Sequence, residues 1–293
     1  MSENTTETLF ISIGNLRFDS PRTIDLGDCR IRPLKEIDAD VRQMMMLGVG
    51  TPYDFRYPMP QCDYVLETTG TQKDFESLVM RALAVFRLFK DAQIVCESLV
   101  VGRPPRGTVS FRHFIPWSRI GIPPYYLKEN EQRNFAEFWK GLTGLDSTNF
   151  AVYRFALADF RPYLYDRFAD YVESMEYLFV PDSGGGEIRY KFSSRSALIL
   201  GRYEAGSKRL QIYEEMKDAY DTRSAIVHGT VPAEDRLHIG ENKFSRWEDA
   251  NQLLRQYNRE AILFFFNRAC LGDRNKRTEL LERLLISDPR IVE

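Results

Sequence analysis

The sequence predicts an α+β protein in which a mixed α/β N-terminal domain, residues 1–128, precedes an all-α helical bundle, residues 129–293. Three observations support this prediction. The first half alternates short β-rich segments with a single amphipathic stretch. A segment rich in proline and polar residues, Pro116–Glu131, then interrupts the pattern. After it, apolar residues recur at three- and four-residue intervals almost to the end of the chain, as they do in helices.

In the first half, Gly, Pro and Asp turn signals separate segments rich in β-forming residues. Strands are expected over Leu9–Gly14, Arg30–Pro33, Tyr64–Thr69, Gln93–Gly102 and Thr108–Phe114. Asp74–Lys90 has the apolar spacing of an amphipathic helix, and Thr71-x-x-Asp74 before it resembles a capping box. Thr51–Met59, rich in proline and aromatic residues, is expected to be a loop. No catalytic signature stands out in this half.

The second half reads as helix almost throughout. Helices are expected over Glu131–Leu142, Thr148–Phe160, Arg161–Phe179, Arg189–Tyr203, Lys208–His228, Arg246–Cys270 and Lys276–Ile286. The loop Pro181–Gly186 ends the third of them, and Phe264–Phe266 are expected to anchor the core. Together these segments predict a helical bundle.

Composition limits the class of protein. A formal net charge of −2 argues against general nonspecific binding to nucleic acid, although a local basic cleft is compatible with it. The four cysteines are scattered without metal-ligand spacing, so buried free thiols in a reducing compartment are expected. The chain start lacks the features of a signal peptide, and no apolar stretch is long enough to cross a membrane. We therefore expect a cytoplasmic protein.

The most informative stretch is Tyr213–Gly229. It has helical spacing and ends at glycine, the usual residue of a left-handed helix cap. Its last turn carries Arg223 and His228, whose side chains would project roughly 140° apart on a regular helix. They can still converge on one cleft, because arginine is long. A permanently charged guanidinium beside a group that titrates near neutral pH suits phosphate chemistry.

Each of these two residues also has a purely structural explanation. His228 could satisfy the last carbonyl groups of its helix, and Arg223 could form a salt bridge to Glu214, Asp218 or Asp221. Functionally, the carbonyl end of a helix stabilises a protonated histidine, so that His228 could donate a proton. Arg223 could stabilise the charge of a phosphorane by bidentate contact with its oxygens.

The segment Tyr220-Asp-x-Arg-Ser-x-x-Val-His-Gly229 resembles the catalytic helix of HEPN domains. The closest resemblance is to the Apea-like HEPN family, which carries a Tyr-x-x-Arg-Ser-x-x-x-His-Gly signature. Upstream, Tyr171–Phe179 is similar to the first core helix of that family, and Arg189–Tyr203 is similar to the second. The resemblance covers about Asn149 to Cys270.

Three further residues are supporting candidates. Ser224 follows the arginine where many HEPN nucleases have Asn, Asp or His, and the Apea-like branch resembles this chain in having serine. Its hydroxyl could position a phosphate or bond back to the helix backbone. Glu176 and Tyr220 are weaker candidates, since acidic and aromatic residues on bundle helices are usually solvated or packed.

The resemblance implies an endoribonuclease that needs no metal and no cofactor. The ribose 2′-hydroxyl would attack the adjacent phosphate, with His228 as base or acid and Arg223 holding the negative charge. It also implies a homodimer with two Arg-His pairs around one cleft, acting on RNA in a toxin-like or antiphage role. A regulator or phage trigger would then be sensed by the N-terminal domain.

Two alternatives remain open. The first is a noncatalytic HEPN scaffold that binds RNA or protein, which the acidic balance favours and the intact Arg-x4-His disfavours. The second, a nucleotide-modifying partner protein, has no residue in its favour. A catalytic metal site is not expected, because the three histidines lack clustered carboxylates. No phosphate-binding glycine loop or Ser-His-Asp arrangement occurs either.

Overall fold

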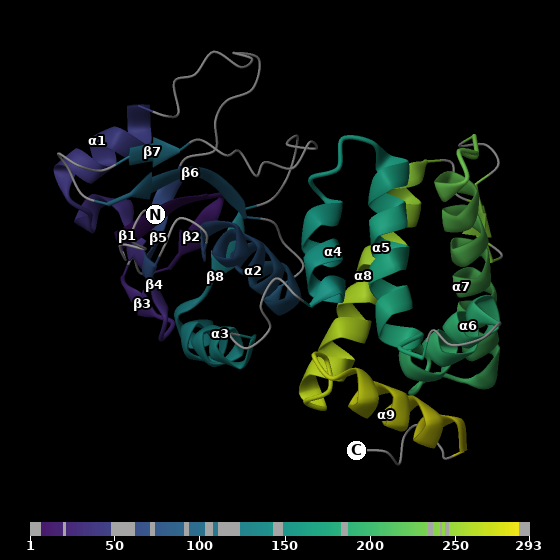
Figure 1. Ribbon diagram of the computed structural model, residues 1–293. Helices are drawn as coiled ribbons and strands as arrows, with labels where there is room; N and C mark the ends of the chain where they lie inside the picture. Colours follow the sequence, from purple (N-terminus) through teal and green to yellow (C-terminus); the bar gives the residue numbers. More distant parts are fainter. Residues whose placement is uncertain are drawn as a thin grey trace, which may run out of the picture. The chain divides into compact units, whose positions relative to one another are not determined.

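The computed structural model describes residues 7–19, 22–47, 62–70, 74–90, 94–102, 108–110, 124–142, 149–182, 187–233, 237–240, 242–243 and 246–286. The chain forms two compact units, residues 1–147 and 148–293 (Figure 1). The first combines a β-sheet with helices, and the second is almost entirely helical. The predicted α+β class is therefore confirmed.

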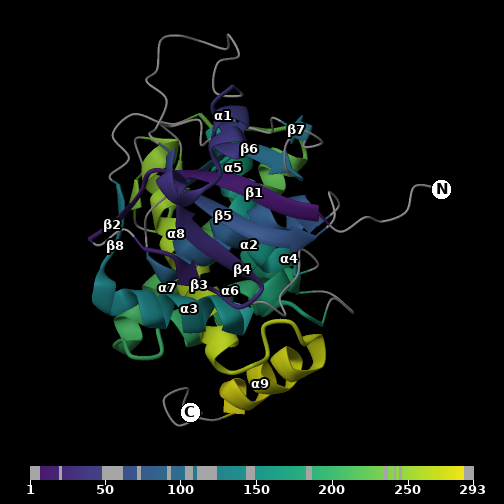
Figure 2. The same ribbon diagram turned by 90° about the vertical axis from the view of Figure 1, so that its left-hand side faces the viewer.

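An antiparallel sheet organises the first unit (Figure 2). Its strand order is β3 (Ile24–Asp25), β4 (Cys29–Pro33), β5 (Cys62–Gly70), β1 (Glu7–Gly14), β6 (Val95–Val101) and β7 (Thr108–Ser110). The central strand β1 is buried on both faces from Leu9 onward, since its side chains alternate between two covered faces. The sequence located β1, β4, β5, β6 and β7, and the rest of the last expected strand, residues 111–114, lies outside the described residues. The sequence missed the two-residue strand β3.

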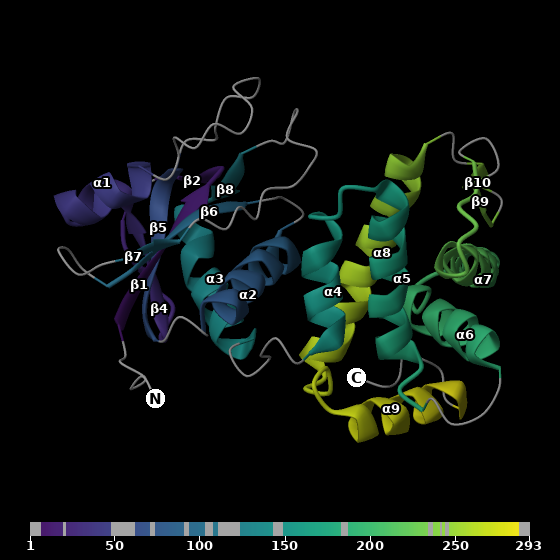
Figure 3. The ribbon, with the colours of Figure 1, turned by 45° about the horizontal axis from the view of Figure 1, so that its top comes forward.

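Helices cover both faces of this sheet (Figure 3). On one face, a 3₁₀ turn, η1 (Leu34–Glu36), leads into α1 (Ala39–Leu47), which the sequence did not predict. Val41 and Met45 of α1 pack there with Phe10 of the sheet. On the other face lies α2 (Asp74–Phe89), the amphipathic helix that the sequence predicted.

The boundary between the units lies later than the sequence predicted. The helix α3 (Glu129–Leu142) was expected to open the helical bundle but packs in the first unit. Phe135 packs on Phe86 of α2 with ring centroids 4.8 Å apart, and Trp139 Nε1 donates to Asp28 Oδ1 at 3.0 Å. The strand β8 (Tyr125–Leu127), within the predicted linker, pairs in parallel with β2 (Leu16–Phe18). These long-range contacts are invisible to local patterns.

The second unit is built around α5. Its helices are α4 (Phe150–Ala158), α5 (Leu164–Phe179), α6 (Ile188–Leu200), α7 (Gly206–Val227), α8 (Trp247–Asn267) and α9 (Arg274–Ile286), with a small hairpin of β9 (His238–Ile239) and β10 (Asn242–Lys243). Helix α5 packs against α4, α6, α7 and α8. At its end, Phe179 lies 6.3 Å from Phe192 of α6 and 5.9 Å from Phe265 of α8, measured between ring centroids. All helices expected here form.

The structure also bears on the expected thiols, the expected core phenylalanines and the expected lack of a membrane-spanning helix. Cys29, Cys96 and Cys270 are buried free thiols, as expected. Of the expected core anchors, Phe264 and Phe265 are buried, whereas Phe266 is only partly so. Among the described residues, no helix is both long enough and apolar enough to span a lipid bilayer.

An ion pair fixes the end of α5 to α6. Arg195 is buried, and its guanidinium donates to Asp182 at 2.5 and 3.2 Å and to the carbonyl of Phe179 at 2.9 Å. The hydrogen bonds from Arg195, assisted by Lys191, hold the pKa of Asp182 well below its ordinary value. The pair stabilises the fold fully above that ordinary value, and its contribution disappears as pH falls toward the lowered pKa.

We therefore expect Asp182→Asn to lower the free energy of unfolding by about 3 kcal/mol at pH 7, because the buried Arg195 loses its charged partner. The difference from the wild type should shrink below pH 3.8, the ordinary aspartate value. Urea denaturation across this pH range measures it. Glu137→Gln, which breaks an exposed pair with Arg133, is the control and should change little. Equal losses in the two variants would contradict this assignment.

Candidate functional site

The last turn of α7 ends in a well-formed cap. The backbone N–H groups of His228, Gly229 and Thr230 donate to the carbonyls of Ser224, Ile226 and Ala225 at 3.1, 2.9 and 2.8 Å. Gly229 has a φ of +84°, the left-handed conformation that glycine adopts without strain. This is the Schellman arrangement, in which backbone donors satisfy the free carbonyls at a helix end. The predicted glycine cap is therefore confirmed.

His228 is exposed at this cap. Because backbone N–H groups already satisfy the carbonyls of Ser224, Ala225 and Ile226, the helix end does not need the imidazole as a cap. The structural alternative for His228, in which its ring would satisfy those carbonyls, therefore loses its basis. The side chain stands at the surface, where a ligand can reach it.

Arg223 points toward α5 instead of along its own helix. Its Nη2 lies 3.2 Å from Glu173 Oε1, and its Nη1 lies 3.8 Å from Glu176 Oε2. The side chain is 22% exposed, so the guanidinium sits at the edge of the bundle and not in its core. Two carboxylates of α5 thus hold the candidate arginine of α7.

The acidic residues that the sequence suggested as partners of Arg223 are engaged elsewhere. Glu214 pairs with Lys217, and Asp221 pairs with Arg189 of α6. Asp218 accepts a hydrogen bond from the backbone of Gly240 at 2.9 Å. All three suggested pairings are wrong, because Arg223 is on the face of α7 that packs toward α5.

Glu176 and Tyr220 share this environment. Burial raises the pKa of Glu176; Arg223 partly offsets that increase, and the like charge of Glu173 adds to it. Burial also raises the pKa of Tyr220, with a further increase from Glu176 and a decrease from Arg223. The Tyr220 ring packs on Phe192 with centroids 5.8 Å apart. Tyr220 therefore remains a neutral phenol beside the arginine.

Ser224 is partly exposed beside Arg223. Ser193 and Ser194 of α6 donate their hydroxyls to the carbonyls four residues earlier, at 2.8 and 2.7 Å. Over the part of the chain that the structure describes, the Ser224 hydroxyl makes no such bond. The back-bonding alternative is therefore not adopted.

The structure brings Arg223, Glu176 and Tyr220 together where α5 and α7 meet. His228 is five residues, or roughly 1.4 turns, further along, at the exposed helix end. Two neighbours that sequence reasoning missed belong to the same cluster: Glu173, and Arg154 of α4, whose Nη2 lies 3.1 Å from Glu173 Oε2. The spacing of Glu173 and Glu176 was a usable signal, since residues three apart share a helix face.

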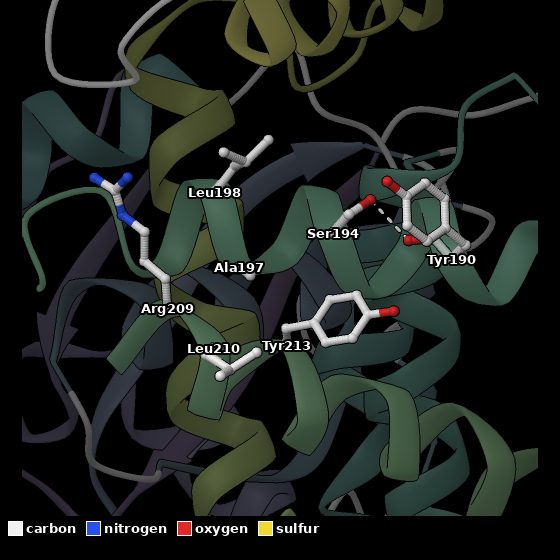
Figure 4. Close-up of a pocket in the computed structure, with 7 residues that line it drawn as sticks. All are labelled: Tyr190, Ser194, Ala197, Leu198, Arg209, Leu210 and Tyr213. Carbon is white, nitrogen blue, oxygen red and sulfur yellow. Dashed lines mark hydrogen bonds between the residues drawn. The ribbon is translucent and has the colours of Figure 1, made fainter. Parts of the chain in front are cut away.

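A separate groove lies between α6 and α7 (Figure 4). It has a volume of about 450 Å³ and is lined by Tyr190, Ser194, Ala197, Leu198, Arg209, Leu210 and Tyr213. Neither Arg223 nor His228 lines it. Tyr190 and Leu210 are well exposed, so this side of the two helices presents an apolar surface.

The described residues contain no group of three or more His, Cys, Asp or Glu side chains placed to hold a metal ion. His113, the isolated histidine of the first half, lies outside the described residues. Comparison of the chain with models of protein families, with curated proteins and with solved structures found no match.

The cap at Gly229 gives a direct test of the local geometry. Gly229→Ala should lower the free energy of unfolding by about 1 kcal/mol, because alanine disfavours a φ of +84° although space for its Cβ is free. Gly206→Ala, on the first turn of the same helix with equally free space, is the matched control. It should leave stability unchanged or raise it slightly. Urea denaturation measures both, and equal effects would contradict the assigned cap.

Proposed function

We propose that this protein is a metal-independent endoribonuclease of the HEPN type, with Arg223 and His228 as its catalytic residues. The observation that carries the proposal is the arrangement at the end of α7. A permanently charged guanidinium is held at the edge of the bundle, and an exposed histidine that the helix cap does not require follows five residues later. The sequence around this pair resembles the Apea-like HEPN signature.

In the proposed reaction, the ribose 2′-hydroxyl attacks the adjacent phosphorus, and the bond to the 5′-oxygen of the next nucleotide breaks. His228 removes the proton of the 2′-hydroxyl or protonates the leaving 5′-oxygen. Arg223 stabilises the negative charge that builds on the phosphate oxygens. The products are a 2′,3′-cyclic phosphate, or its hydrolysed form, and a free 5′-hydroxyl.

Among the described residues, the proposed site on one chain has one histidine, His228, whereas the reaction needs both a base and an acid. We propose that a second copy provides the other, so that two α7 ends line one cleft. The apolar surface of α6 and α7 supports this part of the proposal. Tyr213 and Val227 are fourteen residues apart, so their side chains project within about 40° of each other. Val227 is exposed, so the helix end adds a second apolar side chain on the same side of α7.

A noncatalytic scaffold that binds RNA or protein is the second candidate. The observation in its favour is the pairing of Arg223 with two carboxylates, which reduces the charge available to a phosphate. The exposed His228 has no role in that reading. For the nuclease, we propose a cytoplasmic, toxin-like role in antiphage defence, with a regulator or phage trigger sensed by the first unit.

The proposal predicts different effects on the cleavage rate for substitutions of His228 and of Arg223. His228→Ala should lower the cleavage rate by on the order of 10² to 10⁴, the usual contribution of acid–base catalysis. Arg223→Lys should fail nearly as badly as Arg223→Ala, because lysine offers a compact ammonium in place of the planar fork. Cleavage of single-stranded RNA in excess chelator measures these rates.

All these variants should remain folded, because both residues lie at the surface or the edge of the bundle. Circular dichroism and thermal unfolding check this. A folded His228→Ala protein that cuts RNA at the wild-type rate would leave the scaffold reading standing. Loss of wild-type activity in chelator, with rescue by magnesium or manganese, would overturn the metal-independent mechanism.

The dimer is tested through the apolar surface. Leu210→Glu should convert a wild-type dimer into a monomer and lower activity, because it places a charge on the surface expected to be buried. Leu285→Glu changes an equally apolar, exposed side chain on α9 and should leave the dimer intact. Light scattering at micromolar concentration gives the masses. A monomeric wild-type protein would contradict the dimer.

A further inference from the structure

A ladder of alternating charges runs from the end of α4, across α5, to α7. It consists of three arginines and three carboxylates, each ion-paired with the next, in the order Arg161, Asp170, Arg154, Glu173, Arg223 and Glu176. The residues come from four separate places in the sequence, and the three-residue spacing of the carboxylates on α5 is the local signal among them. We call this set the charge ladder.

Glu173 forms ion pairs with both Arg223 and Arg154. Its Oε1 accepts from Arg223 Nη2 at 3.2 Å, while its Oε2 lies 3.1 Å from Arg154 Nη2. The three side chains are 19%, 22% and 27% exposed, respectively. Partial burial weakens screening by solvent and salt, so such pairs hold their geometry better than surface pairs.

Arg154 is itself fixed on three sides. Its Nη1 lies 2.5 Å from Asp170 Oδ1, and its guanidinium stacks over the Phe150 ring at 4.9 Å from the centroid. Asp170 is only 4% exposed and is also bound by Arg161 Nε at 2.5 Å. Hydrogen bonding to Asp170 raises the pKa of Arg161. The position of Glu173 is therefore set by α4 as well as by α5.

The charge ladder also sets the extent to which carboxylates offset the positive charge of the Arg223 guanidinium. Because Glu173 divides its negative charge between two guanidiniums, it does not neutralise either of them. At the other contact, Glu176 Oε2 has no hydrogen-bond partner, and its distance of 3.8 Å from Arg223 Nη1 is long for a direct bond. Arg223 Nε is buried without a partner. Among the described residues, Nη1 makes no hydrogen bond, so its N–H groups remain available as donors.

We propose that Glu173 and Arg154 are positioning residues that hold the Arg223 guanidinium in place for substrate phosphate. This inference rests on the proposed function and extends it to two residues on α5 and α4. A free arginine side chain samples many rotamers and loses that freedom when it binds a phosphate. A guanidinium fixed before the substrate arrives does not lose that freedom during the reaction, and fixed charges stabilise a transition state without reorganisation.

The first test measures the order of Arg223 without any RNA. In the wild type, the Nε–H proton of Arg223 should give a resolved, slowly exchanging NMR signal, identified by its absence in Arg223→Lys. In Glu173→Gln and Arg154→Met this signal should broaden or exchange away. Arg189→Gln, which removes the ion pair between α6 and Asp221 of α7, is the matched control and should leave the signal unchanged. An unchanged signal in Glu173→Gln overturns the inference.

The second test asks whether Glu173 positions the Arg223 guanidinium or only offsets its charge. If Glu173 positions Arg223, Glu173→Gln should lower kcat on the order of 10-fold and change KM little, and combining it with Arg223→Lys should add little further loss. If Glu173 merely masks the charge, kcat should rise, and the inference is overturned. Should Arg154→Met fail to fold, Glu173→Gln alone carries both tests. A wild-type protein that cuts no RNA removes the proposed function but leaves the NMR result standing.

Discussion

The second unit depends on α5, which is buried on one side and charged on the other. Phe168, Met175 and Phe179 are fully buried within the bundle, while Asp170, Glu173 and Glu176 form ion pairs with neighbouring helices. Arginines on α4 and α7 must approach these carboxylates, since a partly buried charge without a partner is costly. The same helix therefore organises both the core and the position of Arg223.

Backbone capping at the end of α7 complements this arrangement. The ion pairs with α5 fix Arg223, and the glycine cap closes the helix one turn later without using the His228 ring. Arg223 is thus held by the side chains of α5. His228 is exposed, because backbone N–H groups and not its ring form the helix cap. A group that stabilises charge benefits from a fixed position, whereas a group that transfers protons must be accessible to its substrate.

The sequence predicted the elements of this protein better than their contacts. The periodicity of α5, α7 and α8 and the glycine at the end of α7 are local signals, and each was located correctly. The place of α3 in the first unit follows from contacts of Phe135 and Trp139 with residues far away in the chain. The partners of Arg223 were missed for the same reason: Glu173 is 50 positions upstream, whereas local reasoning proposed acids on α7 itself.

Under the proposed function, the Arg223–His228 pair cuts RNA through the ribose 2′-hydroxyl. A DNA strand that contains a single ribonucleotide, incubated with the protein in excess chelator, distinguishes this mechanism from the alternatives. We expect one cut, on the 3′ side of that ribonucleotide, with a 2′,3′-cyclic phosphate on one product and a 5′-hydroxyl on the other. A 2′-O-methyl group at the same position should prevent the cut. Cleavage of the all-DNA strand, or of the 2′-O-methyl strand, would contradict this mechanism.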